Sequence, residues 1–128
     1  GDATGAADFC KWVEDVLVDV IDMTKEKMEK YYDEHVTDTM CKNELYKKYY
    51  MDTIVEDTSA VTGLEMIRRI VGMANVKDIT TIADEAKRAR AEKICITAAI
   101  DFIKNRSDKK CGKCFLKTLK DAIAEVDA

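Results

Sequence analysis

The sequence has 128 residues, of which 47% are hydrophobic and 36% charged, a balance typical of one folded domain and unlike that of disordered chains. It contains no proline, five glycines and one histidine, His35, which disfavours both turn-rich β folds and histidine-based catalysis. The net charge of −4 argues against a general nucleic-acid binder, and the most apolar run, 94–103, is interrupted by Asp101 and too short to span a membrane. We therefore expect a soluble, single α-helical domain over residues 1–128.

Charge is distributed unevenly along the chain. Residues 1–40 hold eleven acidic and four basic side chains, whereas residues 41–128 hold fourteen acidic and seventeen basic ones. Such asymmetry can steer a charged partner, although solvated helix faces without a partner produce the same pattern.

The first predicted element is one long amphipathic helix. Its apolar residues recur with helical spacing from Phe9 to Tyr32, and charged residues occupy the opposite face.

Two shorter helices are expected next. One runs from about Met40 to Ile54, and the polar triplet 57–59 predicts a turn after it, because short polar side chains compete for backbone hydrogen bonds. Thr62 and Glu65 then resemble a capping box that opens a helix ending near Val71.

The last two predicted helices form the centre and the closing side of the domain. A fourth helix runs from Ile79 to about Lys104, capped by Asp78 or Thr80, and its second half is apolar on most faces, as expected at the centre of a bundle. After a polar turn at 105–110, a fifth helix carries apolar residues from Phe115 to Val126. The fold class is therefore all-α, a compact bundle of about five helices with a long first helix.

Five cysteines are many for a cytosolic protein of this size and favour two disulfides with one thiol left over. A continuous first helix would place Cys10 nearly 40 Å from its far end, where Cys41 must lie. This favours Cys10 with Cys111 and Cys95 with Cys114, which leaves Cys41 unpaired, while other pairings stay open. The two disulfides would staple the bundle.

The motif Cys111-Gly112-Lys113-Cys114 has other possible roles. Two thiolates at this spacing are half of many zinc sites, but the other half is missing, so we predict no metal. The motif also resembles a redox dithiol, but the strands of a thioredoxin-like fold are not evident, so we predict no cofactor and no hydrolytic or redox turnover.

Two groups of side chains are candidate partner contacts. Tyrosines bury a large area at small entropic cost, and lysines attract acidic surfaces. Both groups have plain structural explanations as well, since tyrosines often cover a core and lysines often lie on a solvated face. The candidates are Tyr46, Tyr49 and Tyr50, together with Lys109, Lys110 and Lys113.

Three features favour an extracellular location. The chain begins without methionine, as in a mature sequence whose leader has been removed, although an expression scar would look the same. The cysteine content points the same way. A sequon at Asn105, in the predicted turn 105–110, is a possible glycosylation site.

The segment Asp8-Phe9-Cys10-Lys11-Trp12, lone cysteines at 41 and 95, and Cys111-Gly112-Lys113-Cys114-Phe115 before an amphipathic helix resemble the anopheline mosquito salivary family that includes anophensin and albicin. This resemblance spans nearly the whole chain and carries no catalytic motif. It implies a secreted, non-enzymatic inhibitor of host defence that binds a host plasma protein complex, in the alternative pathway of complement or in contact-phase coagulation. The alternative is a secreted helical carrier of small hydrophobic ligands.

Overall fold

The structure is a computed structural model that describes residues 3–128. This part of the chain is all-helical and contains no strand, as the absence of proline and of period-two patterns predicts. The elements are α1 (Ala3–His35), α2 (Glu44–Val71), α3 (Lys77–Thr80), α4 (Glu85–Lys104), the short 3₁₀ helix η1 (Arg106–Asp108) and α5 (Gly112–Asp127).

The second long helix, α2, corrects the sequence prediction, because it passes through 57–59 without a turn. The hydroxyls of Thr58 and Thr62 donate to carbonyl oxygens one turn earlier, those of Ile54 and Thr58, and so do not compete with the helix. The Ser59 hydroxyl instead donates to the Phe102 carbonyl of α4 at 2.8 Å. The two helices predicted over 40–71 are therefore one.

The helix α4 also begins later than predicted. Its cap is Asp84, whose carboxylate accepts from the backbone N–H groups of Ala86 and Lys87, and not Asp78 or Thr80. The stretch 77–80 forms the separate short helix α3. The predicted fifth helix is confirmed as α5.

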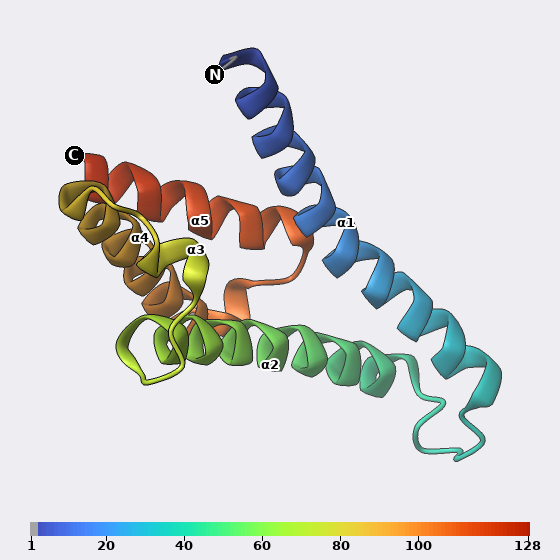
Figure 1. Cartoon of the computed structure of the whole chain (residues 1–128). Helices are drawn as coiled ribbons and strands as arrows, with labels where there is room; N and C mark the ends of the chain where they lie inside the picture. The colour runs from blue at the N-terminus through green and yellow to red at the C-terminus, as the bar shows by residue number, and fades with distance from the viewer. Residues whose placement is uncertain (1–2) are drawn as a thin grey trace.

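The core lies among α2, α4 and α5 (Figure 1). Phe102 of α4 and Phe115 of α5 are almost fully buried, with ring centroids 5.2 Å apart. Small residues on α2 and α4, including Ser59 and Ala98, let these two helices approach closely. Helical periodicity therefore predicted α4 at the centre of the core, but the apolar stripe of α1 from Phe9 to Val20 lies largely exposed outside it.

The long helix α1 leaves this core. It packs mainly against α5 and only slightly against α2, from which it diverges in Figure 1. The junction with α5 is tight, because Gly112 lies directly against the Val18 backbone and its N–H donates to the Asp22 carboxylate at 2.7 Å. The middle of α1, and not its beginning, is therefore the part held by the C-terminal helix.

This junction explains why the structure does not support the predicted disulfide staples: all five cysteines are free thiols. Cys10 lies eight residues before Val18 on α1, so it is about 12 Å along the helix axis from the residue that Gly112 contacts. Cys95 lies seven residues before Phe102, about 10 Å along α4 from the Phe102–Phe115 contact next to Cys114. Both separations exceed the span of a disulfide.

Across the described residues 3–128, none of the helices combines the length and the apolarity that crossing a membrane requires.

Candidate functional site

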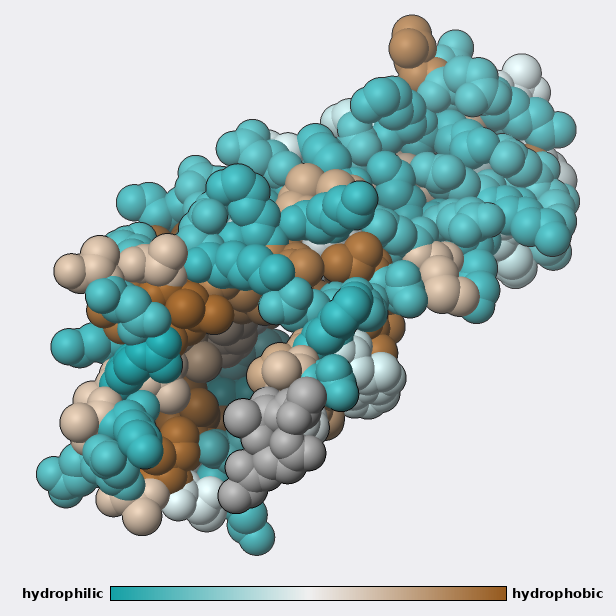
Figure 2. All heavy atoms as spheres, turned by 90° about the horizontal axis from the view of Figure 1, so that it is seen from above, coloured by the Kyte–Doolittle hydropathy of each residue, from teal (hydrophilic) through white to brown (hydrophobic). Residues whose placement is uncertain are grey.

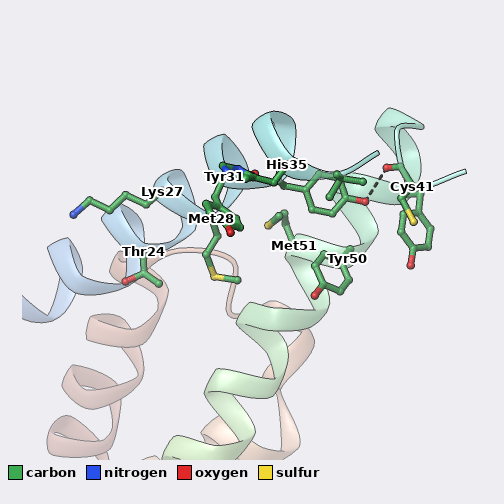
Figure 3. Close-up of a pocket in the computed structure, with 11 residues that line it drawn as sticks. Thr24, Lys27, Met28, Tyr31, His35, Cys41, Tyr50 and Met51 are labelled. Atoms are coloured by element: carbon green, nitrogen blue, oxygen red, sulfur yellow. Dashed lines mark hydrogen bonds between the residues drawn. The ribbon is translucent and has the colours of Figure 1, made fainter. Parts of the chain in front are cut away.

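A groove opens between the C-terminal half of α1 and the N-terminal half of α2, closed at one end by the connection 36–43. Its volume is about 830 Å³ and its lining is mainly apolar and aromatic. Met28 from α1 and Met51 from α2 lie on facing sides of it, whereas the ammonium group of Lys27 extends away (Figure 3). The divergence of α1 from α2 therefore leaves a hydrophobic space that no other part of the described chain fills.

Four tyrosines border this groove. Tyr32 and Tyr50 face each other from α1 and α2 with ring centroids 5.7 Å apart, and Tyr46 stacks on Tyr50 at 6.4 Å. Tyr31 stacks on His35 at 3.9 Å. The predicted contact residues Tyr46 and Tyr50 are thus brought together here, whereas Tyr49 lies outside the groove and is 66% exposed.

A hydrogen bond ties the connection to the groove wall. The Tyr32 hydroxyl donates to the Cys41 carbonyl oxygen at 2.7 Å (Figure 3). Partial burial of the Tyr32 ring, followed by the negative charge that Cys41 can carry, raises the pKa of this phenol. His35 lies exposed at the end of α1, and its Nδ1 lies 3.0 Å from the Tyr31 carbonyl oxygen.

The three predicted lysine contacts have different environments. Lys109 is buried, with its Nζ 2.6 Å from the Asp101 carboxylate. Lys110 bonds Glu56 at 2.6 Å, and that hydrogen bond, opposed by burial, raises the pKa of Lys110. Lys113 is exposed. Lys109 and Lys110 are thus engaged by acidic side chains of the same chain, although the Lys110 side chain stays 43% exposed. The partner of Lys110 lies 54 residues away on α2, a pairing that local sequence pattern does not reveal.

Asp101 is an ionic centre that sequence analysis treated only as an interruption of an apolar run. Its carboxylate accepts from Lys109 at 2.6 Å, from the Asn105 side chain at 2.6 Å and from the Thr118 hydroxyl at 2.8 Å. Burial alone would raise the pKa of Asp101, but these hydrogen bonds outweigh it and lower the pKa to about 2. The group therefore joins α4 to α5, and the predicted sequon residue Asn105 is engaged in it.

The cysteine motif lies at the start of α5. Cys111 is the residue before the helix, and its Sγ lies 3.0 Å from that of Cys114. Within residues 3–128, no three histidine, cysteine or acidic side chains are gathered closely enough to hold a metal ion.

Figure 2 shows hydrophobic atoms around a hollow in one half of the visible face, while the other end is mostly hydrophilic. The N-terminal half of α1 carries large apolar side chains on the surface, among them Phe9 and Trp12, each about 60% exposed. Exposed apolar groups continue along α1 as Val13, Val16 and Val20. This apolar face of α1 has no partner in the described chain.

Comparison with known proteins finds partial similarity to one kind of enzyme. The chain is 39% identical over 62 residues to methylthioribose kinase 2 of Oryza sativa subsp. japonica, a match that covers 48% of this chain and 14% of the kinase. It is 26% identical over 109 residues to methylthioribose kinase of Escherichia coli O45:K1 (strain S88 / ExPEC), covering 77% of this chain and 26% of that protein. It is 27% identical over 90 residues to methylthioribose kinase of Bacillus pumilus (strain SAFR-032), and this match covers 70% of this chain and 23% of that protein.

The matched stretches thus span about a seventh to a quarter of the length of these kinases. No protein-family profile matches the chain, and no solved structure matches it.

Proposed function

We propose that this chain forms a helical part of a kinase related to the methylthioribose kinases, and that its role there is to supply packing surface. The similarity to kinases of this one name from a plant and two bacteria supports the proposal. The phosphorylation of methylthioribose belongs in this proposal to the whole kinase, because the matches cover a minor share of those enzymes.

The apolar face of α1 is the structural observation that favours such a role. Single exposed apolar residues are ordinary, but a continuous face with Phe9, Trp12 and Val16 marks a surface that another protein surface covers. In a larger enzyme that cover would come from the rest of the polypeptide. The core of α2, α4 and α5 would then hold α1 in place through the junction at Gly112.

A chimeric enzyme tests the proposal. In the rice kinase, the stretch that aligns with this chain is replaced by the 62 residues of this chain that match it. Phosphorylation of methylthioribose by the chimera is then measured. We expect the chimera to fold and to keep activity within about tenfold of the parent, a loss of about 1.4 kcal/mol in transition-state stabilisation at most. A matched chimera with an unrelated helical hairpin of equal length is the control and should be inactive. A folded chimera without activity would contradict the kinase proposal.

A second candidate follows from the tyrosine-lined groove, namely the secreted inhibitor of host defence that acts by binding a protein complex. Stacked tyrosines at the mouth of an apolar groove are suited to hold an apolar segment of a partner, and aromatic side chains dominate the energetics of many interfaces. Between residues 3 and 128 the helices are joined by short connections, which offer no extended loop that could enter a protease cleft. The protein would therefore inhibit by occupying a surface of the alternative-pathway convertase or of a contact-phase factor.

Surface plasmon resonance against assembled convertase, with haemolysis as the functional readout, tests this second candidate. Tyr50→Ala should mainly speed dissociation, and Tyr49→Ala, outside the groove, is the matched control. Lys113→Glu should mainly slow association and reduce its dependence on salt. Absence of binding and of protection at micromolar protein would contradict the inhibitor proposal, and a lipid retained in native mass spectrometry would favour a carrier.

A further inference from the structure

The two thiols of the Cys111–Cys114 motif are arranged for bonding to each other. Their Sγ atoms are 3.0 Å apart, and the Cys114 N–H donates to the Cys111 carbonyl oxygen at 2.9 Å, which fixes the backbone between them. Cys111 has the extended backbone of a residue that precedes a helix. A disulfide requires a sulfur–sulfur distance of about 2.05 Å. Rotation of the two side chains that brings the sulfur atoms about 1 Å closer together therefore allows the bond to form.

The environment favours reaction at Cys114. The hydrogen bond between the two sulfur atoms, opposed by burial and assisted by the charge of Lys109, lowers the pKa of Cys114. Hydrogen bonding and burial raise the pKa of Cys111, with a further contribution from Asp22. Both thiols are only partly buried, so a small reagent can reach them.

The other cysteines lack this arrangement. Cys10 is exposed on the outer part of α1, Cys41 lies in the connection before α2, and Cys95 lies about 10 Å along α4 from the level of Cys114. Burial raises the pKa of the Cys95 thiol, which makes it a poor nucleophile. Any exchange reaction that ends in an intramolecular bond should therefore select Cys111 and Cys114.

We propose that Cys111 and Cys114 are a modification site, a dithiol that small disulfides such as oxidised glutathione convert reversibly into an intramolecular disulfide. In the first step the Cys114 thiolate attacks one sulfur of glutathione disulfide, which forms a mixed disulfide and releases one glutathione thiolate. The Cys111 thiolate then attacks the Cys114 sulfur and releases the second glutathione. Two protein thiols are oxidised, one glutathione disulfide is reduced, and the two thiol protons end on the two glutathione molecules.

The position of the pair gives the reaction a local structural setting. Gly112, between the two cysteines, is the residue that packs against Val18 and donates to Asp22. The new bond closes a loop within four residues and leaves this backbone contact in place. Oxidation should therefore proceed in the folded protein without loss of helix.

The test incubates the folded, reduced protein in glutathione buffers of stepped reduced-to-oxidised ratio, alkylates the remaining thiols and counts them by intact-protein mass spectrometry. We expect wild type to lose two alkylation sites together, and circular dichroism to stay unchanged. Cys111→Ser should instead accumulate a glutathione adduct on Cys114, because the resolving thiol is missing. Cys10→Ser and Cys95→Ser are matched controls that should still lose two sites.

The same reaction in guanidinium chloride separates a preformed pair from chance proximity. The folded protein should form the Cys111–Cys114 bond at least about tenfold faster than the unfolded chain, because the native geometry raises the effective concentration of the resolving thiol. Equal rates would overturn the proposal. A dithiol that remains reduced at a buffer potential of about −180 mV, the poise of oxidising compartments, would also overturn it. The same holds if the Cys111→Ser variant still forms an intramolecular disulfide.

Discussion

Gly63 of α2 faces the carbonyl oxygen of Ala99 on α4 so closely that a Cβ atom at residue 63 would lie 2.5 Å from that oxygen. The same Cβ would lie 2.7 Å from a side-chain carbon of Ile103. The closest approach of the two core helices therefore depends on the absence of a side chain here. Gly63 has a negative φ, so space and not backbone conformation requires the glycine.

Gly63→Ala should destabilise the fold by about 1–3 kcal/mol, because overpacking at a backbone contact outweighs the gain in helix propensity of about 1 kcal/mol. Urea denaturation followed by circular dichroism measures the change. Gly5→Ala is the matched control, since a Cβ there meets nothing within 4 Å, and it should be neutral or slightly stabilising. An equal response of the two variants would contradict the close contact.

Asp101→Asn should lower stability at neutral pH and remove one source of acid sensitivity. The pKa of Asp101 falls from its ordinary 3.8 to about 2 on folding, so the unfolded chain binds the proton more tightly. The stabilisation is fully present above about pH 4 and is lost as pH falls towards 2. Because the side chain is 36% exposed, about 1 kcal/mol is the expected size.

Denaturation of Asp101→Asn and wild type between pH 2 and 7 is the measurement, and their difference should shrink as the pH falls below 4. Asp15→Asn is the control, because the Asp15–Lys11 pair lies on an exposed helix face and should contribute less than about 0.5 kcal/mol. A gap between wild type and Asp101→Asn that is constant with pH would exclude the ionic role of Asp101.

These two sites show what the sequence could and could not predict. Helical periodicity predicted α1, α5, the all-helical class and the central position of α4, because apolar spacing reports which face of a helix is buried. The turn expected at 57–59 was wrong because the hydroxyl of Ser59 meets a carbonyl on another helix. The Asp101 cluster joins residues from the end of α4 to the middle of α5, and local pattern carries no information on such pairing.

The candidate site was predictable only in part. The tyrosines on either side of the first connection could be expected to gather, because a short connection brings the ends of two helices together. The groove itself depends on the angle at which α1 leaves α2, which is fixed at the α1–α5 junction. For the same reason the pairing of Cys10 with Cys111 failed, since spacing does not tell which part of α1 meets α5.

Tyr32→Phe should loosen the connection 36–43, because it removes the hydrogen bond to the Cys41 carbonyl while it keeps the ring in the groove. Hydrogen–deuterium exchange should be several-fold faster in 36–43 and unchanged in α4. Tyr49→Phe, outside the groove, should have no effect. Uniform exchange across the whole protein in Tyr32→Phe would instead indicate global destabilisation and contradict a local tether.

Asp22→Ala should free α1 from the start of α5, because the Gly112 N–H loses a charged acceptor, a change of about 1–2 kcal/mol. Limited proteolysis should cut α1 faster than in wild type, while the core of α2, α4 and α5 persists. Asp19→Ala, an exposed position on the same helix, is the control. Equal cleavage of the two variants would show that the Asp22 bond does not hold α1.

The 33 residues of α1 make a rod about 50 Å long. A spherical chain of 128 residues would have a radius of gyration near 14 Å, so α1 is longer than twice that value. Because α5 contacts α1 near the middle of that helix, both ends of α1 extend away from the centre of mass. The molecule therefore tumbles anisotropically, and its axis of slowest reorientation is set by one helix. Amide groups of α1 whose N–H bonds follow that axis will relax differently in NMR from those of α2, α4 and α5.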